Sequence, residues 1–428
     1  MLSCKLRPLF HWQQPKTEII KEGTAEMKEK LIAIVLALVL LLVPMTACSN
    51  SSVNEPSNTD IETDPDLDTE NPVRIGVQSY LTGTNADFGA YINDAMELIE
   101  NRINSDGGVL GRKLEIVIED CGSDQQTTIN ATTKQITDDT LCAIVGNAQS
   151  AWSLAVDGMI ENAKIPYICC GSSAGLVATQ NPYFWIPRMT DDVNAYICAE
   201  FAHEELGMND PAFIYMNNAS WSGTCEQVTA AMRELYGIEI TKTYAYDPDN
   251  DKDFSSFATQ IINSGCDGLI ASSYQNDAGL IMRAMGEAGF DKPCLGANSA
   301  YADVVANQIA GEYANGWYCT ADWNVATESE LGREWAAEYE EVYGRAPNLH
   351  AAVTTDGILL LVNAIETAGS TDREAINEAM GQTKDFLGVT CYYTADGFNS
   401  MAQSLLKLQT QDGVPTVIGV VERPQLDK

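Results

Sequence analysis

The sequence predicts an α/β protein whose body consists of two doubly wound lobes, each a parallel β-sheet covered by helices on both faces. Short β-rich runs alternate with helical runs along the chain, which is the pattern typical of parallel sheets. The alternation occurs in two successive sets, before and after Arg188. With 428 residues, the chain is also too long for one compact core and has the length of two ordinary domains.

The N-terminal region resembles an export signal. Residues 31–45 form an apolar run of fifteen residues that follows Lys28 and Lys30. A basic start before an apolar run of this length is typical of a signal peptide, and the run is short for a membrane span. The alternative interpretation is an uncleaved anchor helix that ends at Pro44.

A lipidation motif follows the apolar run. Residues 45–48 read MTAC, and small residues before a cysteine resemble a bacterial lipobox, although methionine replaces the usual leucine. We therefore expect residues 1–47, with Met27 as the start, to be removed and Cys48 to carry lipid. The polar, acidic residues 48–72 contain no Lys or Arg and cannot bury enough apolar area to fold, so they predict a disordered tether.

The first set of elements begins at residue 73. The strands that we predict in this set are 73–77, 114–118, 143–146 and 166–169. A helix is expected from about Gly89, because Ala95, Ile99 and Ile103 recur at helical spacing, and the glycines after Asp106 end it. Further helices are expected at 124–138 and 153–162.

The second set follows Arg188. The strands that we predict there are 212–216, 238–244, 268–272 and 293–296, with helical segments between them. In doubly wound sheets, ligands bind beyond the carboxyl ends of the strands. The loops that directly follow predicted strands are therefore the places where binding residues are expected.

Composition excludes several classes of function. The net charge of −35 disfavours nucleic-acid binding, because the phosphate backbone repels an acidic surface. The twelve cysteines and three histidines form no zinc-binding spacing, so we expect no metal and no cofactor. Most cysteines lie in apolar runs such as 141–143 and 168–170, which predicts small buried side chains.

Enzyme motifs are also missing. The residues around Ser150 read GNAQSAW, which does not match the GxSxG elbow of serine hydrolases. The loop after residue 145 lacks GxGxxG, and no GxxxxGK[ST] occurs. Neither His203 nor His350 is expected in a cleft loop. We therefore predict a protein that is not an enzyme.

A series of short motifs runs in a recognisable order along residues 73–425. The motifs are Ile75-Gly76-Val77, Leu81-Thr82-Gly83, Phe88-Gly89, residues 107–114 (GGVLGRKL), residues 144–146 (IVG), residues 253–255 (DFS), residues 285–290 (MGEAGF) and residues 310–316 (AGEYANG). Each one is a turn or a cap, but their shared order resembles the type I periplasmic binding proteins of the Leu/Ile/Val-binding class.

This resemblance implies two Rossmann-like lobes joined by three hinge crossovers near 188–191, 321–324 and 390–392. The lobes implied are 73–189 plus 323–390, and 190–322 plus 391–428. The resemblance also implies an extracytoplasmic substrate-binding lipoprotein on the cell membrane. Its partners would be an ABC permease and ATPase, and its ligand an amino acid or a related small polar carboxylate or amide.

Residues of the first lobe can be matched to the family's binding site. Ser150 matches the serine that holds the ligand carboxylate, although it can also cap its helix. Gly171 matches a backbone contact and Ser173 a hydroxyl contact, with a simple turn as the alternative. Phe88 and Tyr80 match aromatic residues over the cleft, with core packing as the alternative.

The second lobe offers aromatic candidates. Trp221 stands where the family often has tyrosine, and Tyr274 keeps the family tyrosine. Gln149 and Trp152 flank Ser150 and are included as candidate ligand contacts. Because Trp152, Trp221 and Tyr274 can stack on a ring, a sugar ligand stays open as an alternative.

Asn298 departs from the amino-acid binders, which commonly have an acidic residue there to pair with the ligand ammonium. Either another acid supplies the charge, with Asp277 and Asp303 as candidates, or the ligand has no ammonium group. A urea or amide, an aromatic acid and a neutral polar ligand therefore stay open. A sensor subunit with the same two-lobed body is a further alternative to transport.

Overall fold

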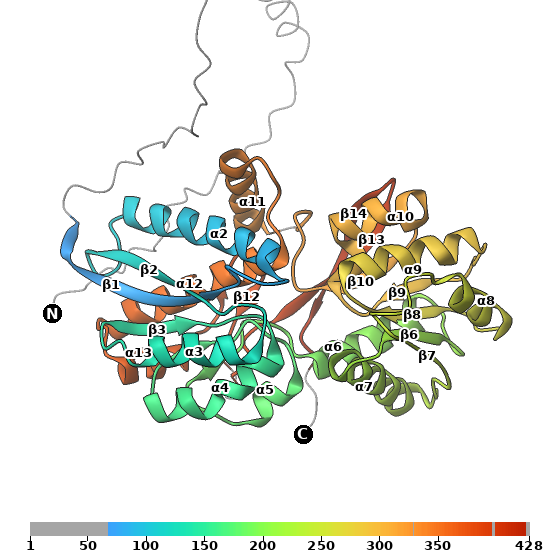
Figure 1. Cartoon of the computed structure of the whole chain (residues 1–428), viewed down its shortest axis with the longest axis horizontal. Helices are drawn as coiled ribbons and strands as arrows, with labels where there is room; N and C mark the ends of the chain where they lie inside the picture. The colour runs from blue at the N-terminus through green and yellow to red at the C-terminus, as the bar shows by residue number, and fades with distance from the viewer. Residues whose placement is uncertain (1–66, 328, 396–398, 425–428) are drawn as a thin grey trace, which may run out of the picture. The chain divides into compact units, whose positions relative to one another are not determined.

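A computed structural model of the chain describes residues 67–327, 329–395 and 399–424. The predicted signal peptide 1–47 and the predicted lipidation site Cys48 lie outside the described residues, as does most of the predicted tether. The described part contains two large sheets, and both carry helices on their two faces (Figure 1). The predicted α/β class with two doubly wound units is therefore confirmed.

The first sheet has five parallel strands in the order β2-β1-β3-β4-β5. The strands are β1 Asp68–Ser79, β2 Arg112–Asp120, β3 Leu141–Val145, β4 Tyr167–Ile168 and β5 Phe184–Trp185. The first four contain the predicted strands or overlap them, and β5 was not predicted. Two residues are too few to show any periodicity, so β5 is defined only by its pairing with β4.

Strand β1 begins earlier than the sequence indicated. Residues 68–72 belong to the strand, although they were assigned to the disordered tether. Asp68 pairs with Arg112, whose guanidinium donates to the carbonyl oxygens of Asn71 at 2.7 Å and Pro72 at 3.1 Å. These long-range hydrogen bonds order a polar segment that its own composition would leave unfolded.

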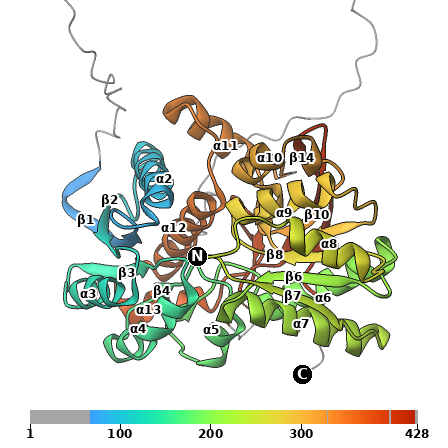
Figure 2. The same cartoon turned by 45° about the vertical axis from the view of Figure 1, so that its right-hand side comes forward.

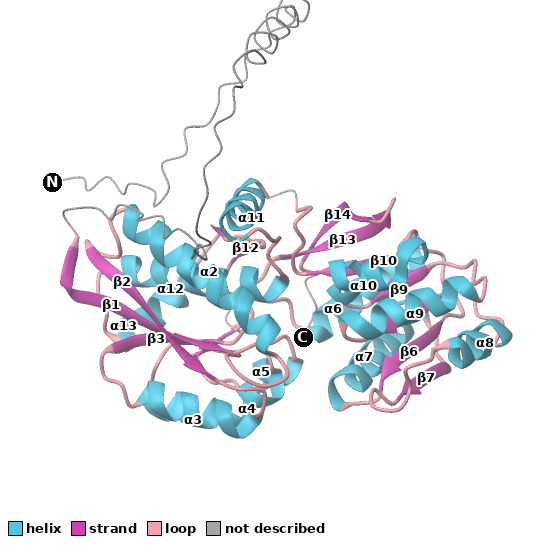
Figure 3. Ribbon diagram, turned by 45° about the horizontal axis from the view of Figure 1, so that its top comes forward, coloured by secondary structure: helices cyan, strands magenta, loops and turns pink. Residues whose placement is uncertain are grey.

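Helices cover both faces of the first sheet (Figure 3). The helices around this sheet are α2 Ala86–Ser105, α3 Gln125–Ile136, α4 Ser150–Ala163, α5 Ala174–Ala178, α11 Glu330–Tyr343, α12 Leu349–Ala368 and α13 Arg373–Met380. Helices α2 and α12 pack on each other on one face, and α3 and α4 pack on the opposite face. Helix α12 is long and apolar enough to cross a membrane, but 78% of that stretch is buried, as in a core helix.

The second sheet has seven strands in the order β14-β13-β10-β9-β8-β6-β7. Its parallel strands are β6 Ala212–Met216, β7 Lys242–Tyr246, β8 Leu269–Ser272, β9 Cys294–Gly296 and β10 Tyr318–Ala321. The antiparallel strands β13 Ser404–Gln411 and β14 Val414–Glu422 extend it beyond β10. The sequence predicted β6, β8 and β9 well, but none of β10, β13 and β14.

The prediction for β7 was displaced along the chain. The segment 238–241 follows α7, where the amide of Ile238 donates to the carbonyl of Met232 and closes the helix end. Ile240 is buried among the helices, so this apolar run belongs to a helix terminus and its packing. The strand itself begins only at Lys242.

Helices also cover both faces of the second sheet (Figure 2). These helices are α6 Asp191–Glu200, α7 Ala219–Tyr236, α8 Ser255–Asn263, α9 Gln275–Glu287 and α10 Val304–Ala310. Buried residues of α6 and α7 form one core layer, and those of α8, α9 and α10 form the other. The ten cysteines of the described residues are all buried and free, which confirms their prediction as small core side chains.

The chain passes between the two sheets three times. The first passage follows β5 and the second follows β10, near the predicted residues 188–191 and 321–324. The third comes later than residues 390–392, because Ser400 still bridges Ile186 beside the first sheet and β13 begins at Ser404. A short hairpin of β11 Phe386–Leu387 and β12 Tyr392–Tyr393 occupies the predicted place. The residue limits of the lobes stay a prediction.

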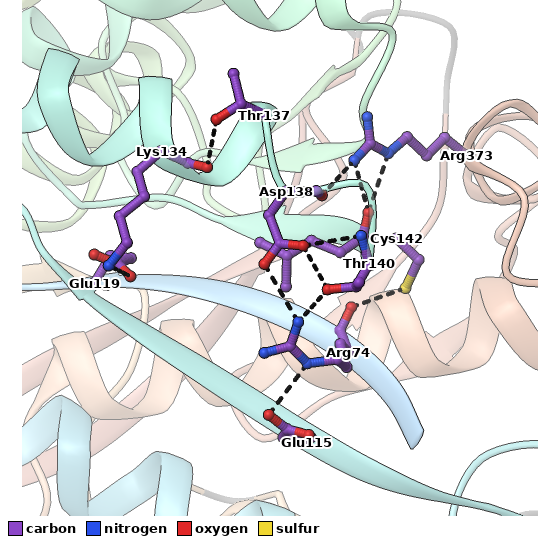
Figure 4. Close-up of polar contacts among 10 residues, drawn as sticks. Arg74, Glu115, Glu119, Lys134, Thr137, Asp138, Thr140, Cys142 and Arg373 are labelled. Carbon is purple, nitrogen blue, oxygen red and sulfur yellow. Dashed lines mark hydrogen bonds and ion pairs between the residues drawn. The ribbon is translucent and has the colours of Figure 1, made fainter. Parts of the chain in front are cut away.

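The amino-terminal edge of the first sheet is fixed by a polar network (Figure 4). The Arg74 guanidinium donates to Glu115 on β2 at 3.1 Å and to Asp138 beside β3 at 3.3 Å. Arg373 at the start of α13 donates to the carbonyl oxygen of Asp138 at 2.9 Å. These contacts connect strands β1 to β3 with α13 at the amino-terminal ends of the strands. The loops that can carry binding residues follow the carboxyl ends of the strands, on the opposite side of the sheet.

Candidate ligand-binding site

A cavity of about 170 Å³ lies between loops of the two sheets. This volume is well above the roughly 10–15 Å³ that a cavity needs to hold a single water molecule, so the cavity has room for a small molecule. The lining residues that bear on its chemistry are Phe88, Gln149, Ser150, Ser172, Arg188, Asp191, Trp221, Tyr274, Asn298, Asp322 and His350.

Ser150 presents a hydrogen-bond donor to this cavity. It is the first residue of α4, directly after the loop that follows β3. Its Oγ accepts the backbone N–H groups of Ser172 at 3.3 Å and Ser173 at 3.2 Å. Because these bonds occupy both lone pairs of the hydroxyl oxygen, its proton is available to an acceptor in the cavity. The amino-terminal end of α4 adds a favourable field for a negative group.

Gly171 and Ser173 lie behind Ser150 and do not line the cavity. A Cβ atom at Gly171 would lie 2.6 Å from the Ser150 Oγ, so only glycine leaves the serine in place. The Ser173 hydroxyl accepts the Gly175 N–H at 3.3 Å and caps α5. The residue between them, Ser172, lines the cavity in their place.

The aromatic candidates of the first lobe are divided between core and cavity. Tyr80 is 1% exposed, and its hydroxyl accepts the Ala148 N–H at 3.0 Å, so it lies in the core and holds the loop before α4 in place. Burial raises the pKa of Tyr80 well above its usual value. Trp152 packs edge-on against Tyr80, with ring centroids 6.3 Å apart, and does not line the cavity. Phe88 does line it, as predicted for an aromatic wall.

The second lobe contributes Trp221 and Tyr274, whose rings meet edge to face with centroids 5.4 Å apart. The Trp221 Nε1–H is buried and has no hydrogen-bond partner among the described residues. Asn298 donates from Nδ2 to the Ser273 carbonyl oxygen at 2.9 Å, while its buried Oδ1 is also unpartnered in the described part of the chain. An indole donor and an amide acceptor of two cavity-lining residues are thus left without a partner among the described residues.

Three charged side chains at the crossovers, which were not predicted as binding residues, line the same cavity. Arg188 lies in the first crossover, and its Nε and Nη2 donate to Asp322 Oδ2 in the second crossover at 3.1 and 2.5 Å. Asp191 begins α6 and lies against the same guanidinium. Burial raises the pKa of the Asp191 carboxyl, and the charge of Arg188 opposes that shift.

The two acids that the sequence suggested for an ammonium lie elsewhere. Asp277 is buried in the second lobe, where its Oδ2 accepts the Tyr246 hydroxyl at 3.0 Å. Asp303 caps α10 by accepting the Val305 N–H at 2.8 Å. Neither lines the cavity, so neither is placed to meet a ligand there.

His350 lies in the site although it was not expected in a cleft loop, so that prediction was wrong. It is the second residue of α12 and lines the cavity, with its ring 4.9 Å from that of Phe88. Burial, followed by the nearby charge of Arg188, lowers the pKa of His350 to about 4, so the ring is neutral at neutral pH. Asn348 could have indicated this position, because it is a typical N-cap residue and predicts that a helix starts just before His350.

Metal ligands do not cluster in this part of the molecule. No group of three or more His, Cys, Asp or Glu with the geometry to hold a metal ion occurs within residues 67–327, 329–395 and 399–424. The site is thus formed by hydroxyl, amide and aromatic groups around one Arg–Asp pair. Such a set recognises a small polar molecule through hydrogen bonds and charge.

Comparison with known proteins agrees with this architecture. The family model of the periplasmic binding proteins matches residues 72–413. Leu/Ile/Val-binding protein homolog 7 of Brucella melitensis is 22% identical over 363 residues, which cover 80% of this chain and 90% of that protein.

Solved structures share the fold, among them the following two. The branched-chain amino acid transporter substrate binding protein LivJ of Streptococcus pneumoniae, in complex with isoleucine, is 25% identical with a TM-score of 0.71, covering 82% of this chain and 98% of that one. A solute binding protein of an ABC transporter from R. palustris, in complex with benzoate, is 18% identical with a TM-score of 0.71, covering 83% of this chain and 98% of that one. The chain therefore belongs to the periplasmic binding protein family, as a type I protein similar to the Leu/Ile/Val-binding class.

Proposed function

We propose that the chain is the extracytoplasmic substrate-binding lipoprotein of an ABC transporter, and that it binds an amino acid or a related small polar carboxylate in the cavity at Ser150. The observation that carries this proposal is the Ser150 hydroxyl, whose oxygen accepts two backbone N–H groups and whose proton is left for a ligand oxygen. A carboxylate is the acceptor that gains most from such a donor at a helix start.

The rest of the cavity supports a ligand with an apolar part. The rings of Phe88, Trp221 and Tyr274 supply apolar walls, and His350 adds a neutral ring. LivJ in complex with isoleucine and the R. palustris protein in complex with benzoate both carry a carboxylate ligand on this fold. The common element of these ligands is a carboxylate beside an apolar group, and the Ser150 donor and the aromatic walls support the same ligand class for this cavity.

A ligand screen tests the proposal directly. Thermal shifts are measured with the standard amino acids, small amides, urea, benzoate and simple sugars, because a ligand that binds only the folded state raises its stability by RT ln(1 + [L]/Kd). Carboxylates with an apolar side chain are expected to stabilise, and sugars are expected to have no effect. Stabilisation by sugars alone would refute the proposed ligand class.

Ser150→Ala provides the matched site test. Removing a donor to a charged oxygen costs about 1.5–3 kcal/mol, so the affinity for the best carboxylate should fall roughly 10- to 150-fold. The control is Ser153→Ala one turn further into α4, where the hydroxyl is buried and does not line the cavity. Equal affinities of the Ser150→Ala protein and the unsubstituted protein would place the ligand elsewhere.

The anchor is part of the same proposal. Cys48 follows an apolar export signal, and the described body begins after an acidic segment that can act as a tether. Labelling of the protein with a fatty acid in cells is expected, and Cys48→Ser should abolish it and release the protein from the membrane. A Cys48→Ser protein that keeps the label would contradict lipidation at this residue.

A further inference from the structure

We infer that the cationic group of the ligand is bound by the crossover carboxylates Asp191 and Asp322, near Arg188, and that the ligand is an α-amino acid rather than a simple carboxylate or a neutral amide. This inference rests on the proposed function, because it assumes that the ligand occupies the Ser150 cavity. It assigns the ammonium site to the crossovers and not to the loop after β9.

The first argument is the balance of charge. Among the described residues that line the cavity, the ionisable charges are those of Arg188, Asp191 and Asp322, since His350 is neutral. One guanidinium faces two carboxyl groups, so the cavity carries one negative charge in excess when both of them are ionised. A carboxylate with little access to water is costly unless a cation accompanies it. A ligand ammonium supplies the missing charge.

The second argument is the geometry of Asp322. Both contacts from Arg188 go to the same oxygen, Oδ2. The other oxygen, Oδ1, is buried without a hydrogen-bond partner among the described residues, although Asp322 lines the cavity. Buried oxygens of this kind are rare, because each loses its hydration without compensation. An N–H donor of a ligand would satisfy it.

Asp191 is placed to share the same ligand group. Its backbone N–H donates to the carbonyl oxygen of Ser172 at 2.7 Å, which holds the start of α6 against the loop that carries the Ser150 contacts. The carboxyl of Asp191 and the hydroxyl of Ser150 therefore line one cavity from adjoining segments. An α-amino acid carries an ammonium and a carboxylate on neighbouring carbon atoms, which matches a cavity lined by both a carboxyl group and a hydroxyl donor.

The alternative acids in the second lobe do not compete for this role. Asp277 is bound by Tyr246, Asp303 caps α10, and Asn298 carries no charge. Asp192 has a buried unpartnered Oδ1 but does not line the cavity. Asp192 is therefore the natural control, since it has the same side chain one position further along the helix.

The experiment uses the full chain and measures affinity by calorimetry. The probes are the standard L-amino acids and, for each one that binds, the same acid with hydrogen in place of the ammonium group. Asp191→Asn should weaken binding of the amino acid roughly 10- to 150-fold and leave the acid without an ammonium unchanged or tighter. Asp192→Asn should leave both affinities within about twofold, and urea unfolding verifies that each variant is folded.

Asp322→Asn is the second variant. It should show the same selective loss, but it also leaves Arg188 with a weaker partner, so its stability is measured in parallel. If amino acids bind with unchanged affinity to both variants, the inference is overturned while the proposed function stands. If the acids without an ammonium bind and amino acids do not, the inference is again overturned. If no carboxylate binds at all, the proposed ligand class is wrong, and the inference that rests on it is overturned as well.

Discussion

Replacing Gly171 with alanine should weaken ligand binding although Gly171 itself does not reach the cavity. Its added Cβ would lie 2.6 Å from the Ser150 Oγ and 3.2 Å from the Ser150 Cα. Both distances are shorter than ordinary contacts, so the serine must move. The backbone at Gly171 does not have a positive φ, so alanine brings no conformational strain of its own and the effect runs through Ser150.

The expected magnitude follows from the bond that Ser150 would lose. A donor to a charged oxygen contributes about 1.5–3 kcal/mol, which is roughly a 10- to 150-fold change in Kd. Overpacking at this position should also lower the free energy of unfolding by about 1–3 kcal/mol. Isothermal titration calorimetry with the best ligand of the screen measures the first quantity, and urea unfolding measures the second.

Gly175→Ala is the matched control, because a Cβ there meets its nearest atoms at 3.6 Å and leaves the N–H bond to Ser173 intact. It should bind normally. The double variant Ser150→Ala with Gly171→Ala should bind about as weakly as Ser150→Ala alone, since both changes remove the same contact. A folded Gly171→Ala protein with unchanged affinity would refute the role given to Ser150.

Three further predictions concern stability. Gly146→Ala should lower the free energy of unfolding by about 3 kcal/mol or more, because the new Cβ would lie 1.8 Å from the buried Tyr167 hydroxyl, and an unchanged urea midpoint would contradict this packing. The pKa of His350 falls from 6.5 to about 4 on folding, so the free energy of unfolding should decrease as the pH falls from 6.5 to 4, by at most about 3 kcal/mol. In chemical unfolding, His350→Gln should remove this part of the pH dependence. Asn298→Asp should cost about 1–3 kcal/mol in the same assay, since a carboxylate cannot donate to the Ser273 carbonyl oxygen; a stabilised variant would mean that this bond is not made.

The fold was predictable wherever a strand was long and followed by a recognisable turn. Strand β6 coincides with the predicted residues 212–216, and β1 to β4 lie where β-rich runs indicated them. Strand β14 has exposed apolar residues, Val414, Ile418 and Val420, so its amphipathic contrast is weak. It is defined by its pairing with β13, which in turn pairs with β10. Strand β5 is too short to carry a pattern of its own.

The site was predictable in its position and only partly in its residues. The rule that ligands bind beyond strand ends led to the loop at Ser150 and to Trp221 and Tyr274, all of which line the cavity. This rule does not predict which side chains of a loop point into the cavity. Tyr80 lies beneath the loop that it supports, and the Ser173 hydroxyl caps a helix, because hydrogen bonds with neighbouring backbone determine their orientation.

The charged residues of the crossovers were not predicted as binding residues, because no short motif contains them. The sequence nevertheless indicates that Arg188 and Asp322 form a pair. Arg188 follows the buried residues 184–186, and Asp322 lies between the buried Ala321 and Trp323. A charge within an apolar segment is stable only with a partner, since its burial is otherwise too costly. Arg188 is the basic residue of one predicted crossover and Asp322 an acid of the next, 134 positions apart, so their pairing could have been inferred from the two segments together. Asp191 lies near the same guanidinium, which already donates to Asp322, so two carboxyl groups share one cation. A ligand ammonium is therefore the expected further partner of these acids.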